Sequence, residues 1–144
     1  MSGNLLILFL VFFPFAAGLV NYILGRHSKT GRDRVAVLIT AIELAAAIVL
    51  VAMSFETPTD LYWEGFAGFG LHFRADGFRL VMIMIAGIAW FFTTVQSIEY
   101  FNRLSSRNRN RYYMFMLWTL GATMGIFLSA DLYTTFIFFE VMTF

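Results

Sequence analysis

Residues 129–144 read SADLYTTFIFFEVMTF, and one carboxylic acid in this stretch, Glu140, interrupts an otherwise apolar and aromatic run. If a helix starts at Leu132 at a membrane surface, a rise of about 1.5 Å per residue places Glu140 roughly 12 Å deep. A hydrocarbon core about 30 Å thick has its midplane near that depth. An ionisable side chain there costs on the order of 2.5–3.5 kcal/mol, so it ordinarily faces a partner or water and has a function. Glu140 is therefore the first candidate functional residue.

The composition places the chain among membrane proteins. Of its 144 residues 60% are hydrophobic and 13% charged, whereas soluble domains carry about 25% charged residues. It has no cysteine, which excludes disulfides, iron–sulfur clusters and thiolate metal sites, and its two histidines, His27 and His72, stand apart. No phosphate-binding loop, dinucleotide fingerprint or nucleophile elbow occurs. We therefore expect no cofactor, metal or redox site on this chain.

Apolar runs predict an all-helical (all-α) integral membrane fold in which residues 1–144 form one unit. Four runs are long enough to span a bilayer, and a fifth is incomplete because residue 144 lies only about 18 Å from the start of its helix. The expected spans are residues 5–24, 35–53, 78–98, 112–129 and 132–144.

The polar connection 54–75 between the second and third spans has a different pattern. Phe69, Leu71 and Phe73 alternate with other residues near glycines, which predicts a short β-hairpin on the membrane surface. Asp76 precedes the third span and can cap its free N–H groups. Asp131 is expected to cap the fifth in the same way.

The basic residues predict the orientation of the chain in the membrane. Of its ten lysine and arginine residues, eight (four plus four) fall in two predicted loops, 25–34 and 99–111. By the positive-inside rule these loops are cytoplasmic, and the N-terminus and the hairpin face outside. We therefore expect a multi-pass protein of the cytoplasmic (inner) membrane.

The second span carries another acid, Glu43, again about 12 Å from the start of its helix. It is either a protonated acid that hydrogen-bonds to a neighbouring helix, or a second station for a proton. The sequence leaves both interpretations open. In the fourth span, Gly121 and Gly125 have the small-residue spacing that lets helices approach closely.

Three motifs resemble a known family. GLHFRADG (70–77) leads into the third span, the passage from Tyr100 to RYY (111–113) leads into the fourth, and FLSADL (127–132) followed by FIFFEVM (136–142) forms the fifth. These motifs resemble the N-terminal part of the antiporter-like membrane subunits shared by respiratory complex I (NADH:quinone oxidoreductase), Mrp-type sodium/proton antiporters and energy-converting membrane hydrogenases.

The resemblance implies a larger subunit built from inverted helical repeats, a general device of transporters. Glu140 would be the signature acid of its proton path, working in a carboxylate/lysine relay. Burial favours the protonated form of such an acid and a nearby cation favours the ionised form. The lysines of later helices have no counterpart in the predicted spans, so we expect no translocation by this chain alone. Glu43 is not part of the family motif.

The partners implied are other membrane subunits of the same complex, the lipid bilayer and H⁺ or Na⁺, with no nucleic acid. The chain would be a fragment of an ion-translocating subunit, or the first piece of a split one, in an oxidoreductase of the NADH:quinone or hydrogenase type or in an antiporter. Alternatively it is a truncated scaffold or assembly subunit without transport of its own. A small quinone- or lipid-binding protein is the third interpretation. Lysine-bearing helices beyond Phe144 would favour the first interpretation.

Overall fold

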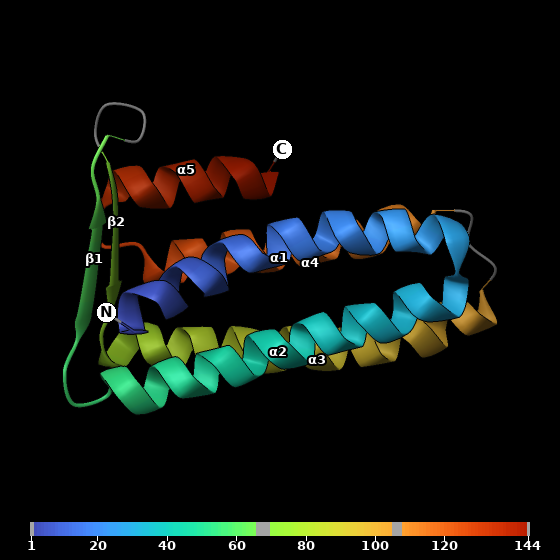
Figure 1. The fold of residues 1–144 in the computed structure, drawn as a ribbon, viewed down its shortest axis with the longest axis horizontal. Helices are drawn as coiled ribbons and strands as arrows, with labels where there is room; N and C mark the ends of the chain where they lie inside the picture. The colour runs from blue at the N-terminus through green and yellow to red at the C-terminus, as the bar shows by residue number, and fades with distance from the viewer. Residues whose placement is uncertain (1, 66–69, 105–107, 144) are drawn as a thin grey trace.

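The structure, a computed structural model, describes residues 2–65, 70–104 and 108–143. These residues form five helices and a two-stranded antiparallel sheet. In chain order the elements are α1 (Ser2–His27), α2 (Lys29–Ser54), β1 (Thr59–Trp63), β2 (Leu71–Ala75), α3 (Gly77–Arg103), α4 (Arg109–Leu128) and α5 (Leu132–Thr143). Figure 1 shows α1 to α4 as a bundle in which successive helices run in opposite directions, with the hairpin across one end and α5 beside that end. The predicted mostly helical fold with one hairpin is confirmed.

Three of the helices, α1, α2 and α3, are long and apolar enough to cross a membrane. Helix α4 is not among them. Half of its residues are buried inside the protein. Because α4 packs against α1, α3 and α5, its outward surface is small and does not need a continuous apolar sequence. Helix α5 is a shorter apolar helix of 12 residues. The number of spans in the membrane therefore stays a prediction.

The helices extend well beyond the apolar runs that predicted them. In the first expected basic loop, 25–34, only Ser28 separates α1 from α2. The Ser28 hydroxyl accepts the backbone N–H of Gly31 at 3.1 Å, so one residue both turns the chain and caps α2. The second expected loop, 99–111, is taken up largely by the end of α3 and the start of α4. Hydropathy locates only the apolar part of a helix, whereas capping and charge pairing continue it into polar sequence.

The hairpin pairs β1 with β2 so that Leu61 lies opposite Phe73. The predicted alternation in β2 is confirmed, because Leu71, Phe73 and Ala75 are all buried against the bundle. The predicted hairpin implied a partner strand but did not locate it at β1, since the short sequence TDLYW is mostly exposed and lacks a clear period. Residue 69, expected on the same strand face, lies outside the described residues.

Strand β2 also holds the junction between α4 and α5. The backbone N–H of Ala130 donates to the His72 carbonyl at 2.8 Å, and the His72 N–H donates to the Thr134 hydroxyl at 3.0 Å. From the start of α3, the Arg79 side chain donates to the Ser129 carbonyl at 3.1 Å. Asp131 accepts the Thr134 N–H at 2.7 Å, so the predicted cap of α5 is confirmed. The direction of α5 is therefore set by the hairpin.

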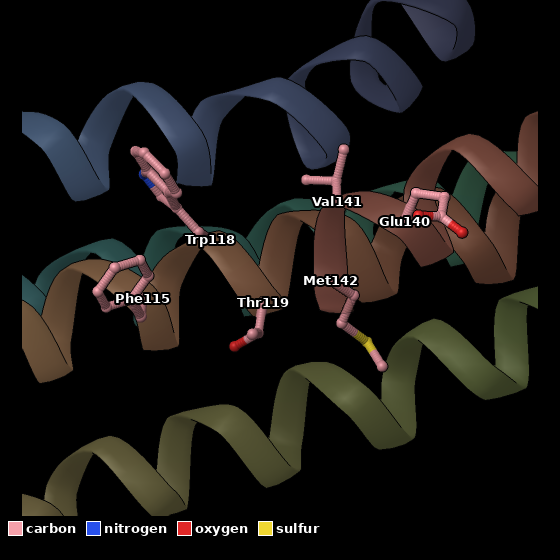
Figure 2. Close-up of a pocket in the computed structure, with 6 residues that line it drawn as sticks. All are labelled: Phe115, Trp118, Thr119, Glu140, Val141 and Met142. Atoms are coloured by element: carbon pink, nitrogen blue, oxygen red, sulfur yellow. The ribbon is translucent and has the colours of Figure 1, made fainter. Parts of the chain in front are cut away.

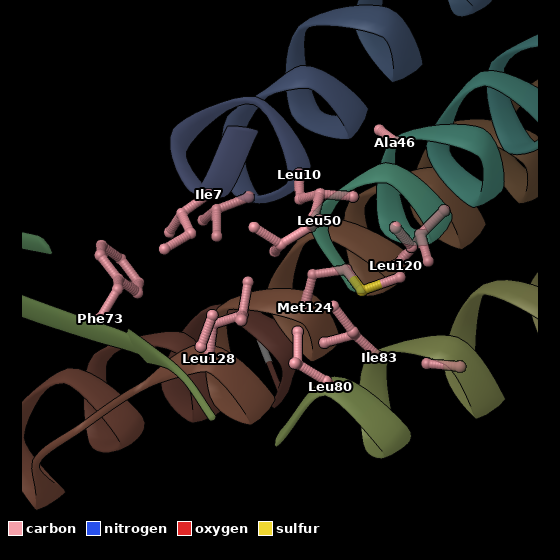
Figure 3. Close-up of a cluster of buried hydrophobic side chains, with 14 of the residues drawn as sticks. Ile7, Leu10, Ala46, Leu50, Phe73, Leu80, Ile83, Leu120, Met124 and Leu128 are labelled. Atoms are coloured by element: carbon pink, nitrogen blue, oxygen red, sulfur yellow. The ribbon is translucent and has the colours of Figure 1, made fainter. Parts of the chain in front are cut away.

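The main core lies between the hairpin and the middle of the bundle (Figure 3). Two glycines of α4 permit its close packing. A Cβ at Gly121 would lie 2.9 Å from both the Val11 carbonyl oxygen and the Phe15 ring, and a Cβ at Gly125 would lie 2.6 Å from the Phe138 ring. The predicted small-residue pair thus serves two partners, α1 and α5, rather than one.

We predict that Gly121→Ala destabilises the protein by about 1–3 kcal/mol, because the backbone of α1 must move to admit one methyl group. Gly77→Ala is the matched control, since a Cβ at Gly77 meets nothing within 4 Å. The measurement is thermal unfolding of both variants in lipid. Equal unfolding temperatures for the two variants would contradict the proposed close contact of α4 with α1.

A second prediction concerns the cap at Asp131. Burial alone would raise the pKa of Asp131, but the hydrogen bonds with Thr134 and the nearby His72 together hold it below its ordinary value. Because the folded pKa is depressed, the stability that this carboxylate contributes is present above the ordinary pKa and is lost as pH falls through the folded one. We expect Asp131→Ala to weaken α5 by about 1 kcal/mol.

Hydrogen–deuterium exchange of the α5 amides measures this effect directly. Exchange in Asp131→Ala should be faster at neutral pH, while Asp131→Asn, which keeps a capping oxygen, should remain close to the parent. If the alanine and asparagine variants exchange alike, the carboxylate does not cap the helix in solution.

Candidate functional site

Glu140 lies in the third turn of α5, and its side chain is exposed in the structure of these residues. Of α5, only Thr134 and Phe138 are buried. Phe138 faces α4, and two residues further along a helix is about 200° around its axis, so the Glu140 side chain does not point into the contact that buries Phe138. The depth of Glu140 along its helix therefore does not bury it within this chain.

Glu140 borders a groove of about 480 Å³ between α4 and α5. Figure 2 shows its six lining side chains, which are Phe115, Trp118 and Thr119 from α4 and Glu140, Val141 and Met142 from α5. The groove is mainly apolar, and its polar members are the Thr119 hydroxyl and the Glu140 carboxylate. The Thr119 hydroxyl donates to the Met116 carbonyl at 2.8 Å. Within the described ranges, the Glu140 carboxylate forms no ion pair.

Glu43 has the opposite environment, because it is completely buried in α2. One turn to either side, Ile39 packs with Ala17 of α1 and Leu117 of α4, and Ala47 belongs to the main core. Glu43 therefore lies between these two apolar layers, inside the four-helix bundle. Neither of its carboxylate oxygens has a hydrogen-bond partner in the described part of the chain. The hydrogen bond to a neighbouring helix that one interpretation expected is not found there.

The two acids are not brought into one site. Glu43 faces the inside of the bundle formed by α1 to α4, whereas Glu140 belongs to α5, which packs on α4 from outside that bundle. A direct carboxylate pair is therefore not formed by this part of the protein.

A cluster of charged residues that was not anticipated lies at the end of the bundle opposite the hairpin. Asp33 accepts a hydrogen bond from Arg32 Nε at 3.0 Å and another from Arg109 Nη2 at 2.6 Å. The side chain of Arg32 is only 5% exposed. In the sequence these residues counted only as loop charges that orient the chain. Once α2 is known to start at Lys29, the spacing of Arg32, four residues before buried Ala36, would have placed it on the buried face.

This charge cluster, Arg32–Asp33–Arg109, connects the start of α2 with the start of α4. Arg32 also donates to the side chain of Asn110, and its guanidinium lies over the Tyr113 ring at 5.6 Å. Arg109 donates to the side chain of Asn102 in α3 at 3.0 Å. The two basic stretches therefore meet at one end, as the predicted topology requires, at the right of Figure 1.

The described residues contain no group of three or more histidine, aspartate or glutamate side chains arranged to hold a metal ion. His72 lies beside the Tyr62 ring in the hairpin, with the ring centroids 5.6 Å apart. His27 is exposed at the end of α1.

Comparisons with known proteins place this geometry in context. The sequence matches no family model. It is 27% identical to a Na(+)/H(+) antiporter subunit of Alkalihalophilus pseudofirmus, with 96% of this chain and 28% of that protein covered. It is 25% identical to an NADH-quinone oxidoreductase subunit of Pseudomonas aeruginosa, with 92% and 28% covered. The chain thus spans a little over a quarter of the length of these relatives.

The fold has a close counterpart among solved structures. A chain of the membrane-bound sulfane sulfur reductase, an archaeal respiratory membrane complex, superimposes with a TM-score of 0.79 over 94% of this chain and 28% of that one, at 19% identity. That likeness concerns the fold alone. From the two sequence relatives, the resemblance predicted from the motifs is confirmed: this chain is a homologue of antiporter-like membrane subunits of sodium/proton antiporters and NADH-quinone oxidoreductases.

Proposed function

We propose that the chain forms part of a membrane subunit that translocates protons, or sodium ions, in an antiporter or a respiratory oxidoreductase. The observation that carries this proposal is its similarity to subunits of an antiporter and of a quinone oxidoreductase over nearly its whole length. The relatives are subunits of larger assemblies, so we propose other membrane subunits of the same complex as partners. The chain's own contribution is the acid on α5.

In this proposal Glu140 exchanges a proton as a cation moves toward it and away from it. When a lysine side chain approaches, its charge favours the ionised carboxylate and the proton leaves. When the lysine withdraws, that stabilisation of the ionised form is lost and a proton is taken up. The mainly apolar groove that Glu140 borders supports this scheme, because it offers few polar groups that would compete with the carboxylate for an approaching cation.

The cation must come from elsewhere in the protein or from another subunit. The single lysine of the chain, Lys29, begins α2 at the end of the bundle opposite the hairpin. Glu140 is exposed and unpaired within the described residues, so its carboxylate is open to a partner that packs on α5.

We further propose that α4 and α5 lie in the membrane with α1 to α3. The charge distribution supports a cytoplasmic location for the end that contains Arg32 and Arg109, with the hairpin on the outside of an inner membrane.

A scaffold role is the alternative function. It is favoured by the same exposure of Glu140, because an acid that pairs with no cation among the described residues does no relay work until a partner supplies one. In that case the packed bundle and its hairpin would stabilise a neighbouring subunit, and the acid would be dispensable.

We predict that Glu140→Gln, introduced into the assembled complex, reduces ion translocation by roughly 10²-fold while assembly is retained, because glutamine cannot release a proton. Translocation is followed in sealed vesicles and normalised to the electrons transferred or to the counter-ion exchanged. The matched control is Glu56→Gln, which changes an exposed acid beyond the end of α2. Full translocation by Glu140→Gln would favour the scaffold role.

The orientation has its own test, because the chain contains no cysteine. We predict that Thr30→Cys, exposed at the start of α2, reacts with a membrane-impermeant maleimide added from the cytoplasmic side. Thr57→Cys, exposed before the hairpin, should react only from the outside. Labelling of both cysteines from one side would contradict the proposed topology.

A further inference from the structure

The interior of the bundle differs between its two halves. Between Glu43 and the hairpin it is filled by the main apolar core, which includes Leu50, Ile83, Leu120 and Met124 (Figure 3). Between Glu43 and the charge cluster it contains two smaller apolar clusters together with buried polar side chains from all four helices. These are Asn21 of α1, Arg32 and Thr40 of α2, Thr94 and Ser97 of α3, and Tyr113 of α4.

Four other buried polar residues lie outside that half, and they do not extend the polar region toward the hairpin. They are found at the hairpin end or on the side of α4 that faces α5, and each is hydrogen-bonded within the protein. They are Ser54, Thr123, Ser129 and Thr134.

We infer that Glu43 is a proton-binding site that water reaches from only one end of the bundle, the end with the charge cluster Arg32–Asp33–Arg109. Nothing in this inference rests on the role proposed for Glu140.

The first support is a stripe on α2 in which three polar residues are aligned with one small apolar residue, Ala36. Arg32, Ala36, Thr40 and Glu43 follow one another at intervals of four, four and three residues, which places them on one face of a helix. All four are buried. The stripe therefore leads from the charge cluster to the acid without leaving the interior.

The second support comes from the layers that the neighbouring helices form. Ala17, Ile39 and Leu117 pack together as one layer across α1, α2 and α4. One turn from this layer toward the charge cluster come Asn21 on α1 and Tyr113 on α4. One turn toward the hairpin, on α2, comes Glu43. Asn21 is thus at a level between the charge cluster and the acid.

The third support is the set of buried polar atoms without partners. Among the residues that the structure describes, these atoms are both carboxylate oxygens of Glu43, both amide atoms of Asn21, Nη2 of Arg32 and Nε of Arg109. Every one belongs to the stripe, to the level of Asn21 or to the charge cluster. Buried polar groups are almost always hydrogen-bonded to protein or to ordered water. We therefore expect water molecules at these atoms.

Thr40 is suited to connect the acid with that water. Its hydroxyl donates toward the carbonyls of Ala36 and Val37 at 3.2 and 3.0 Å, which leaves its oxygen free to accept a hydrogen bond from water. An unpaired ionised carboxylate would be costly at the position of Glu43, so its resting form is the neutral acid. The proton of Glu43 passes to a water molecule on the side of the charge cluster, and another proton returns from that side.

The charged and titratable groups that face this path come from two helices. Helix α2 contributes Arg32 and Asp33, and α4 contributes Arg109 and Tyr113. The polar groups from α1 and α3 on the path are neutral. In the other direction the main core, as far as the structure describes it, offers no polar side chain to which a proton could move.

The test is infrared spectroscopy of the complete protein in its native complex, in membranes transferred from H₂O to D₂O. The carboxyl C=O band that disappears in Glu43→Gln reports the protonated acid, and its downshift reports exchange of its proton. We expect this band to be present and to shift in the parent. In Thr40→Val, which keeps the side-chain shape, we expect exchange to be about tenfold slower.

The matched control is Thr123→Val. Thr123 is also a buried threonine whose hydroxyl donates to the carbonyl four residues earlier, but it lies on α4 beside α5. Exchange of the Glu43 band should be unchanged in this variant. If Thr40→Val does not assemble, Asn21→Leu blocks the same path and carries the same expectation.

The inference is overturned if Glu43→Gln removes no C=O band, or if that band does not exchange. The first result would mean that Glu43 is not protonated, and the second that water does not reach it. It is also overturned if the path variants and Thr123→Val exchange at the same rate. None of these readouts depends on translocation, so they remain informative whatever Glu140 does.

Discussion

The hydrogen bonds between β2 and the junction of α4 and α5 are the constraint on which the candidate relay depends. Ala130 and Thr134 bond to the backbone of His72, and the same strand places Phe73 and Leu71 in the core. A strand across the end of a bundle satisfies backbone groups that a helix terminus leaves free. It also gives α5 a fixed starting direction at Leu132, and this direction sets the position of Glu140 further along the helix.

The opposite end of the bundle is held by a different kind of interaction. Asp33 bonds to two arginines, and the aromatic ring of Tyr113 lies against both guanidinium groups. Charged groups taken out of water are tolerated only when they are paired and hydrogen-bonded. The bundle thus combines an apolar, tightly packed half under the hairpin with a half under the charge cluster in which buried polar side chains lie among smaller apolar clusters. Glu43 marks the boundary between the two.

Much of the fold follows from local sequence. The apolar runs locate all five helices, the alternation of Leu71 and Phe73 identifies β2, and Asp76 and Asp131 cap the helices that follow them. The helix ends were misjudged because their continuation depends on tertiary contacts. The cap at Ser28 and the bonds of Arg32 and Asp33 to Asn110 and Arg109 make this charged stretch stable as helix. Strand β1 likewise exists because β2 is there to pair with it.

By itself the sequence determined the membrane class of this protein, its family resemblance and the two acids with unusual positions, because hydropathy, charge bias and motif spacing are properties of local sequence. The tertiary structure alone decided how the acids differ. It leaves Glu140 exposed at the edge of the groove between α4 and α5, because Phe138 and not Glu140 is buried against α4. It encloses Glu43, because the stripe that carries Glu43 faces three other helices. Burial depends on what packs against a face, and no single helix contains that information.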